Sequence, residues 1–323
     1  MGYLIGTDEA GYGPNLGPLV ISATVWQVPE GVGAGDLYGL LSGAIVPSPG
    51  RVAKNDGPCV AMADSKALYQ PGGGLKHLER GLLAALAVLD RRPTTWRGMW
   101  DTLAARVSGL PAAIPWYAEY DAPIPIDADP AEIPLLANAL GDALSAAGVR
   151  LLEVRPRAVF PEEFNRLVEQ YDSKGAALSH ATLNLAAELI APLDEGSISI
   201  ICDKHGGRNR YRDLLAEHFA EAFIEIHGEG RRQSVYRFGP HERRIEFRFQ
   251  TKAEAYLPAA LASMASKYLR ELAMRALNAF WSARVPGLRH TAGYPQDAKR
   301  FKTEIARAQA ELGIDDRVLW RSR

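Results

Sequence analysis

The chain opens with a short apolar run at residues 3–5 that passes into a glycine-rich segment ending at Pro14. Residues 19–26 follow, and they are rich in β-branched and aromatic side chains, a composition typical of strands. The pattern predicts two strands that pair as a hairpin, with the glycine-rich segment between them. Two carboxylates, Asp8 and Glu9, then stand at the end of the first strand.

Further along, apolar side chains recur at the spacing of three to four residues that is typical of amphipathic helices. This periodicity predicts helices at 75–90, 131–147, 161–171, 176–192, 209–222 and 253–281. Runs rich in apolar and β-branched residues predict further strands at 197–203, near 222–227 and at 243–250. Strands that alternate with helices indicate an α/β layer fold, and the antiparallel hairpin at the start indicates a mixed sheet.

Two segments lack a clear period. Residues 27–60 are rich in Gly and Pro and are predicted to form a loop with little regular structure. Residues 92–134 carry many Pro and Trp residues, and we interpret them as an insertion or lid, either packed on the surface or in contact with a substrate. We expect one domain over residues 1–323, with a helical C-terminal part at 253–323.

The composition is that of an ordinary globular chain. Of 323 residues, 47% are apolar and 23% charged, which argues against disorder and suffices for a sizeable core. No apolar stretch reaches the roughly 18 residues of a membrane helix, and the signal-peptide pattern is missing, so we expect neither membrane spanning nor secretion. Cys59 and Cys202 have no partner nearby in the sequence, which fits a reducing cytoplasm and indicates neither a zinc site nor a disulfide framework.

The net charge of −1 hides an asymmetry along the chain. Residues 1–199 contain 14 basic and 23 acidic side chains, whereas residues 200–302 contain 19 basic and 11 acidic ones. Such a basic segment indicates a face that binds a polyanion. One or two solvated basic helices would give the same count.

A basic run, residues 204–212, directly follows the strand that ends on Asp203. A solvated charge run is the default interpretation of such a cluster. This run, however, abuts a carboxylate and contains two adjacent glycines. We therefore interpret it as a loop that grips phosphate, with Lys204 and Arg208 as contacts.

Four acidic residues occupy places where packing alone would not put them, because they lie at the ends of predicted strands or at the start of the long helix. They are Asp8, Glu9, Asp203 and Glu254. Carboxylates that meet at strand ends repel one another unless a divalent cation neutralises them. Since no His or Cys accompanies them, Mg²⁺ or Mn²⁺ is favoured over zinc. Two such ions about 4 Å apart activate water for phosphodiester cleavage, so phosphoryl chemistry is the natural hypothesis.

Three blocks of sequence carry a family resemblance. The first is Gly6-Thr7-Asp8-Glu9-Ala10-Gly11-Tyr12-Gly13-Pro14, continued by Gly17-Pro18-Leu19-Val20. The second is Asp64-Ser65-Lys66-Ala67-Leu68, and the third is Thr251-Lys252-Ala253-Glu254-Ala255-Tyr256, which runs into residues 262–268. Together, in this order, they resemble the type 2 ribonuclease H family, which comprises ribonucleases HII and HIII. Glu254 is similar to HIII, whose last catalytic acid is typically glutamate.

The resemblance implies a ribonuclease H-like mixed sheet flanked by helices, in a monomeric enzyme. It implies that two Mg²⁺ or Mn²⁺ ions, bound by Asp8, Glu9, Asp203 and Glu254, promote hydrolysis of the RNA strand of RNA–DNA hybrids to 3′-hydroxyl and 5′-phosphate ends. Glycines let the backbone approach the ribose 2′-hydroxyl closely, independently of base sequence. The expected substrate contacts are Gly11, Tyr12, Gly13, Ser65, Lys66, Lys204, Arg208, Lys252 and Tyr294.

Other interpretations stay open. Tyr12 stands where ribonuclease HII commonly has Arg, and the chain starts at the catalytic strand without the N-terminal domain usual in HIII, so it fits neither subtype cleanly. A nuclease of the same fold that acts on DNA or structured nucleic acid is one alternative, and a module that binds hybrids without cutting them is another. Residue by residue, the alternatives are a plain tight turn for Gly11 and Gly13, a helix N-cap beside a solvated lysine for Ser65, and a core aromatic for Tyr294.

Overall fold

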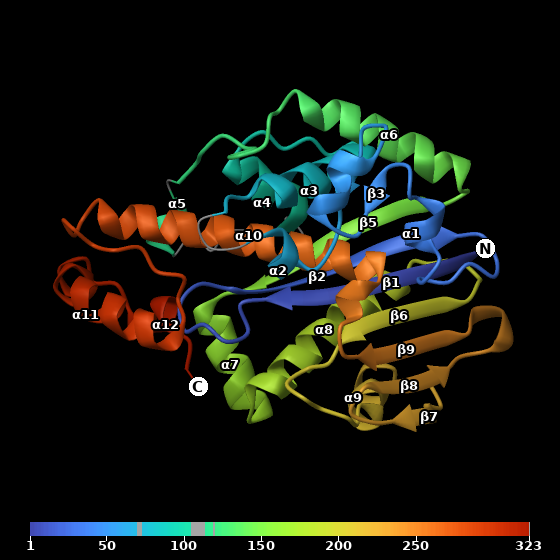
Figure 1. Ribbon diagram of the computed structural model, residues 1–323. Helices are drawn as coiled ribbons and strands as arrows, with labels where there is room; N and C mark the ends of the chain where they lie inside the picture. Colours follow the sequence, from blue (N-terminus) through green and yellow to red (C-terminus); the bar gives the residue numbers. More distant parts are fainter. Residues whose placement is uncertain (70–72, 105–113, 119, 323) are drawn as a thin grey trace.

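The computed structural model describes residues 1–69, 73–104, 114–118 and 120–322. Its centre is a seven-stranded mixed sheet with the strand order β5-β2-β1-β6-β9-β8-β7. Helices cover both faces of this sheet (Figure 1). The predicted α/β fold, a mixed sheet flanked by helices, is confirmed.

The strands at the centre of the sheet are those that the sequence predicts. β1 (Gly2–Ala10) and β2 (Leu19–Val28) pair antiparallel as the expected hairpin. β6 (Ile198–Asp203) lies parallel to β1, and β9 (Ile245–Gln250) lies parallel to β6. The carboxyl ends of β1, β6 and β9 therefore meet at one end of the sheet.

Two strands of this seven-stranded sheet were not predicted from the sequence. β5 (Arg150–Val159) forms one edge of the sheet, and Pro156 interrupts its otherwise strand-like pattern; proline is tolerated there because an edge strand need not donate on both sides. β8 (Gln233–Phe238) alternates buried and more exposed residues, but Ser234 and Tyr236 rather than aliphatic residues fill two buried positions. The last strand is β7 (Glu225–Glu229), which lies near the prediction and pairs antiparallel with β8.

Most of the predicted helices are confirmed to within two residues at each end. They are α3 (Lys76–Val88), α6 (Glu132–Ala146), α7 (Pro161–Tyr171) and α8 (Lys174–Ile190). α9 (Arg212–His218) is shorter than the predicted span of 209–222, because side-chain hydrogen bonds hold the residues before it as a loop. The long helix α10 (Leu257–Ser282) begins four residues later than predicted.

The remaining elements are short or lie near the C-terminal end of the chain. They are α1 (Leu37–Leu40), β3 (Ile45–Val46), η1 (Pro49–Lys54), β4 (Val60–Ala61), α2 (Ser65–Leu68), α4 (Trp96–Ala104), α5 (Pro115–Ala118), η2 (His241–Arg243), η3 (Ala253–Ala255), α11 (Pro295–Glu311) and α12 (Asp316–Leu319). Among the helices that the structure describes, none is both long and apolar enough to cross a bilayer.

Two apolar layers lie on opposite faces of the sheet, as the alternation of strand side chains requires. Leu4 packs in the layer beneath α10 and α3, whereas Ile5 packs in the layer beneath α8. At Gly6 the helix approaches so closely that a Cβ would lie 2.1 Å from the backbone of Pro258 and Ala259. This contact fixes α10 directly over β1 and the residues at its carboxyl end.

Three tryptophans of the predicted insertion at 92–134 contribute to the core. Trp96, Trp100 and Trp116 are buried, and the Trp96 indole N–H donates to the carbonyl of Leu272 in α10 at 2.9 Å. Residues 105–113 and 119 of this segment lie outside the described residues.

Candidate functional site

The register of two parallel strands brings the first pair of acids together. Thr7 of β1 lies opposite Cys202 of β6, so the next residues, Asp8 and Asp203, lie at the same level near the carboxyl ends of the two strands. In open α/β sheets, functional groups gather at this carboxyl end. Glu9 follows Asp8 on β1, and its burial together with the charges of Asp8 and Asp203 raises its pKa.

Glu254 reaches the same place through the turn that follows β9. Lys252 adopts a left-handed backbone with φ 61°, after which Glu254 lies in η3 rather than in the long helix as predicted. Hydrogen bonds from the peptide N–H groups of Ala253 and Lys252 stabilise the Asp203 carboxylate and lower its pKa against the effect of burial. These bonds hold η3 beside Asp203.

The four carboxyl groups influence one another electrostatically. Desolvation by the surrounding protein raises the pKa of Asp8 to about 7, and the charges of Asp203 and Glu254 add to this shift. Desolvation and the neighbouring Asp8 raise the pKa of Glu9 to about 8. Burial also raises the pKa values of Asp203 and Glu254, while both side chains keep some exposure to solvent. The site is thus a set of closely spaced, partly accessible acids.

The donor chemistry of these acids fits a hard divalent cation. Oδ1 of Asp203 is buried and has no hydrogen-bond partner among the described residues, which is costly for an anionic oxygen without a cation. All the donors are carboxylate oxygens, the ligands that Mg²⁺ and Mn²⁺ prefer. As the side chains stand, no three His, Cys, Asp or Glu groups within the described ranges form a ready-made metal cage.

Ser65 and Lys66 lie beside the acids because α2 is linked to α10. The hydroxyls of Ser65 and Ser263 are 3.0 Å apart, and a hydrogen bond from Ser263 lowers the pKa of Asp8. Burial would lower the pKa of Lys66, but the charges of Asp64 and Asp8 outweigh it and raise that pKa. Lys66 is therefore the ammonium group that faces the acid cluster, whereas the buried Ser65 connects α2 to it.

The glycine-rich loop after β1 has a backbone conformation that requires glycine at Gly11. Gly11 has φ +90°, and a Cβ there would lie 2.6 Å from the carbonyl oxygen of Pro18, so another residue would be strained and would clash. At Gly13 the nearest atom to an added Cβ is Cε1 of Tyr294, at 3.9 Å. Tyr294 is 59% exposed and lies against Gly13, so it is a surface aromatic beside the loop and not a core residue.

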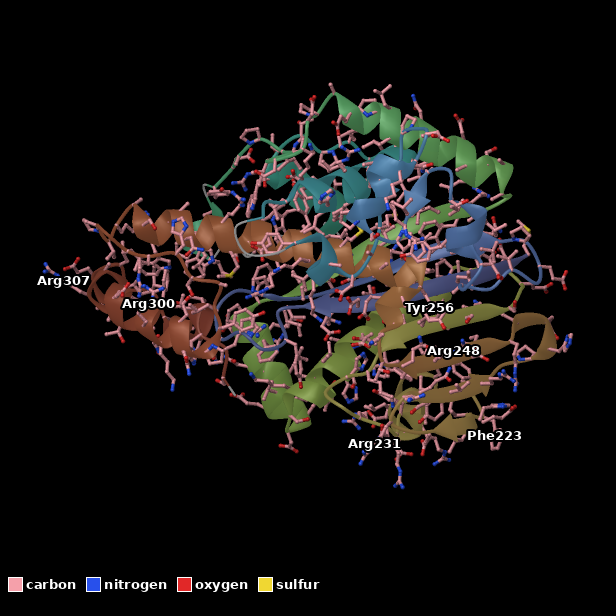
Figure 2. The ribbon with its side chains drawn as sticks, viewed as in Figure 1. Phe223, Arg231, Arg248, Tyr256, Arg300 and Arg307 are labelled. Carbon is pink, nitrogen blue, oxygen red and sulfur yellow. The ribbon has the colours of Figure 1, made fainter. Side chains whose placement is uncertain are left out.

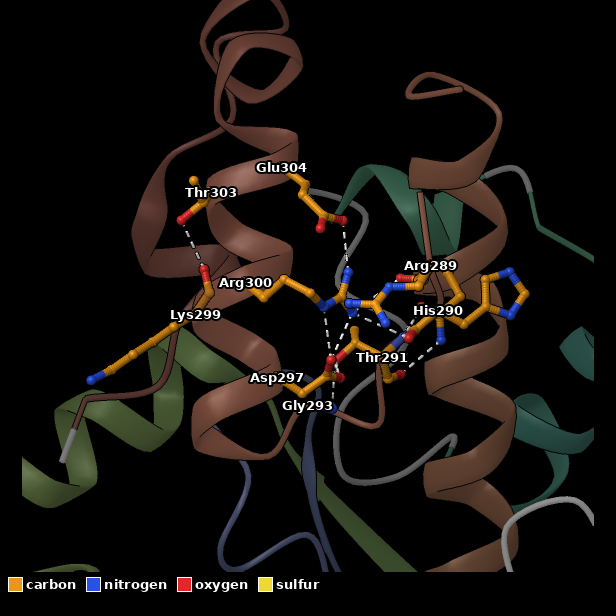
Figure 3. A network of polar contacts seen from close by, with 10 residues as sticks. Arg289, His290, Thr291, Gly293, Asp297, Lys299, Arg300, Thr303 and Glu304 are labelled. Carbon is orange, nitrogen blue, oxygen red and sulfur yellow. Dashed lines mark hydrogen bonds and ion pairs between the residues drawn. The ribbon is translucent and has the colours of Figure 1, made fainter. Parts of the chain in front are cut away.

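A polar network fixes the segment that carries Tyr294 (Figure 3). The Thr291 hydroxyl donates to Asp297 at 2.5 Å and accepts from the peptide N–H of Gly293 at 2.9 Å. Arg300 pairs with Asp297 and donates to the carbonyls of residues 289 and 290. The Gly293 carbonyl in turn accepts from the peptide N–H of Asn15 at 2.7 Å, which joins this segment to the glycine-rich loop.

The Tyr12 hydroxyl lies beside the loop after β6. A Cβ added at Gly206 would lie 3.0 Å from its hydroxyl, and one added at Gly175 would lie 3.6 Å from it. A cavity lined by Tyr12, Gly175, Gly206 and Arg208, among others, opens here. Tyr12 and Arg208 therefore share one surface hollow.

The basic side chains near Asp203 play different structural parts. The Lys204 ammonium donates to the carbonyls of Arg208 and Gly230, to Asn209 and to Ser234, at distances of 2.7 to 3.1 Å. Its donors are thus engaged within the protein. Lys252 is exposed and lines the same cavity as Asp203 and Glu254.

Some residues around the site were missed from the sequence. Ser263 carries no signal because it lies within a helix among small residues. Arg270 and Arg321 are buried and donate to carbonyls of the glycine-rich loop, but nothing in their local sequence distinguishes them from surface arginines. Arg231 lines the cavity at Glu254. The one sequence feature that pointed to it was the excess of basic residues in the segment 200–302.

Comparison with known proteins gives matches among solved structures only. A scan against protein-family models finds no match, and neither does a search of curated proteins. The chain is similar to the ribonuclease HII of Archaeoglobus fulgidus, solved in complex with PCNA, with 15% identity, coverage of 99% of this chain and 94% of that chain, and a TM-score of 0.44.

Two further solved structures are similar over nearly the whole of this chain. Ribonuclease H2 from Pyrococcus horikoshii OT3 is 15% identical, with coverage of 98% of this chain and 92% of that chain, and a TM-score of 0.44. Bst-RNase HIII, solved with Mn²⁺, is 16% identical, with coverage of 99% of this chain and 66% of that chain, and a TM-score of 0.38. All three are type 2 ribonucleases H, the family that the three sequence blocks resemble.

Proposed function

We propose that this protein is a metal-dependent endoribonuclease that hydrolyses the RNA strand of RNA–DNA hybrids and leaves 3′-hydroxyl and 5′-phosphate ends. The observation that carries the proposal is the meeting of Asp8, Asp203 and Glu254 from three separate elements, with one buried oxygen of Asp203 unpartnered. Such a costly arrangement of like charges is explained by cation-dependent chemistry on a phosphodiester.

The carboxylates of Asp8, Glu9, Asp203 and Glu254 would hold two Mg²⁺ or Mn²⁺ ions, which supply activation of water and stabilisation of the leaving oxygen. Lys66 faces the acids and orients a non-bridging phosphate oxygen by its positive charge. The hydrogen bonds of Asp203 to the backbone of η3 keep that carboxylate fixed relative to Glu254. No side chain of the site acts as a covalent nucleophile in this proposal, since water attacks the phosphorus.

Recognition of the ribose falls to the loop at Gly11 and Gly13. At Gly11 only glycine permits the backbone conformation and the close approach of Pro18, and beside Gly13 the Tyr294 ring lies in contact range. We propose that peptide groups of this loop approach the 2′-hydroxyl while the tyrosine ring packs on the sugar. Backbone contacts of this kind carry no base information. We therefore propose cleavage that depends on the 2′-hydroxyl and not on base sequence, by a monomeric cytoplasmic enzyme.

The test is cleavage of three labelled duplexes with Mg²⁺ or Mn²⁺: an RNA–DNA hybrid, a DNA duplex with one embedded ribonucleotide, and an all-DNA duplex. The proposal expects the hybrid to be cut and the all-DNA duplex to stay intact. Cleavage at a single embedded ribonucleotide would show that Tyr12 permits recognition of a junction. Cutting of DNA alone would favour a nuclease with a DNA substrate, and binding of the hybrid without cutting would favour a non-catalytic module.

A further inference from the structure

The turn between β7 and β8, residues 230–232, is fixed next to the acid cluster from two sides. The Lys204 ammonium donates to the carbonyl of Gly230 at 2.7 Å and to the Ser234 hydroxyl at 3.1 Å. The peptide N–H of Thr251 donates to the carbonyl of Arg232 at 3.0 Å. Lys204, which follows Asp203, and Thr251, which precedes Glu254, thus hold this turn in place.

The turn presents cations that have no carboxylate partner. Arg231 and Arg232 are exposed, and within the residues that the structure describes neither side chain forms an ion pair or a hydrogen bond. Arg237 on the neighbouring β8, by contrast, bonds Glu246 at 2.7 Å. Arg231 lines one cavity together with Lys252, Asp203 and Glu254, so unpaired positive charge directly borders the acids.

Basic side chains continue from this cavity around the loop after β6. Gly207 lines both the cavity at Glu254 and the hollow at Tyr12, and Arg208 lines that hollow and a third cavity beside Arg210. Arg231 lies at the same end of the sheet as the carboxyl end of β9 (Figure 2). Cations on successive hollows match a ligand with several negative charges in series and not a single phosphate ion.

We propose that Arg231, Arg232, Lys252 and Arg208 form a phosphate-binding tract for the sugar–phosphate backbone of a nucleic-acid strand that extends from the acid cluster over the β7–β8 turn. The inference rests on the proposed function for the identity of the polyanion. Because the acids repel phosphate when no cation is present, this tract supplies the attraction for initial binding. Its contacts are sequence-independent and release counterions.

Salt dependence of binding tests the tract without catalysis. We would measure the affinity of Asp8→Asn protein for a fluorescent RNA–DNA hybrid in EDTA, between about 50 and 200 mM salt. Each phosphate contact contributes about 0.7 to 0.9 to the slope of log affinity against log salt. The double variant Arg231→Gln, Arg232→Gln is expected to reduce this slope by about 1.4 to 1.8 and to weaken binding at the low-salt end.

The matched control is Arg307→Gln. Arg307 is 91% exposed, pairs with Glu311 on α11 and lies far from the tract (Figure 2), so its loss removes one surface charge without a phosphate contact. An unchanged slope in the double variant, or an equal change in the control, would overturn the proposal. If the wild type does not cleave the hybrid but the double variant still shows the reduced salt slope, the proposed function is contradicted and the phosphate-binding tract is supported.

Discussion

Arg321 donates from Nη2 to the carbonyl oxygen of Gly11 at 2.6 Å. Its guanidinium also contacts the carbonyls of Tyr12 and Pro14, it is fully buried, and it lies 4.4 Å from the centre of the Phe164 ring. The peptide N–H of Arg321 donates to the carbonyl of Asn15 at 2.8 Å. A residue near the far end of the chain therefore sets the shape of the loop that carries the two site glycines.

Replacement of Arg321 by Met is expected to destabilise the protein by about 1 to 3 kcal/mol, because buried carbonyls lose their donor. Denaturant unfolding measures this. Arg317→Met is the control, since Arg317 is 72% exposed and pairs with the exposed Asp315; its effect should stay within about 0.5 kcal/mol. Equal stability of the two variants would contradict the role assigned to Arg321.

Two glycine substitutions should change stability in opposite directions. Gly6→Ala places a Cβ 2.1 Å from the backbone of α10, and overpacking of this kind costs about 1 to 3 kcal/mol or more. Gly141→Ala, inside α6, adds a Cβ to open space and should stabilise by about 0.5 to 1 kcal/mol through helix propensity. Thermal unfolding of both variants checks the packing of α10 on β1.

A histidine pair should make stability depend on pH. Nδ1 of His180 lies 3.0 Å from Nε2 of His218, and burial lowers the pKa of each ring below its usual 6.5, while nearby Glu217 opposes the shift in both. Tyr171 stacks on His180, and Arg208 lowers the pKa of His180 further. The contribution of the neutral pair to the free energy of unfolding is fully present at pH values above the pKa of histidine in the unfolded chain.

As the pH falls below 6.5, the unfolded chain takes up protons that the folded pair rejects, so stability declines toward the lowered folded pKa values. His218→Gln removes one of these rings. The free energy of unfolding of this variant should fall less steeply with decreasing pH than that of the wild type. Parallel profiles for the two proteins would refute the assignment.

Divalent cations should stabilise the fold in the absence of any substrate. Mg²⁺ or Mn²⁺ at about 100 times its dissociation constant adds about 2.7 kcal/mol to the free energy of unfolding. Asp203→Asn should lose most of this gain, and Asp213→Asn, an exposed control on α9, should keep it. A gain that is the same in all three proteins would place cation binding elsewhere.

Asp8, Glu9 and Asp203 could be selected from the sequence because each stands in a short motif at the end of a strand with a clear pattern. Their proximity follows from the parallel register of β1 and β6, which an α/β pattern implies. Glu254 was assigned to the start of the long helix, because the apolar pattern continues backwards from Leu257 and conceals η3.

The sequence could not predict hydrogen bonds between residues that lie far apart along the chain. Lys204 looked like a phosphate contact, yet its ammonium is hydrogen-bonded to the β7–β8 turn, a neighbour that becomes visible only once β8 is known. Arg321 likewise depends on a buried contact with Gly11. Local pattern carries no information about such contacts, because they are set by how segments far apart in the sequence pack together.

The measurement that tests the account most directly is cleavage of an RNA–DNA hybrid with Mg²⁺ or Mn²⁺ by the wild type, Asp8→Asn and Asp203→Asn, alongside hybrid affinity in EDTA. The account expects the wild type to cut the RNA strand and both variants to lose cleavage while they still fold and bind the hybrid. Cleavage at wild-type rates by either variant would contradict the central claim that the carboxylates of β1 and β6 perform the chemistry.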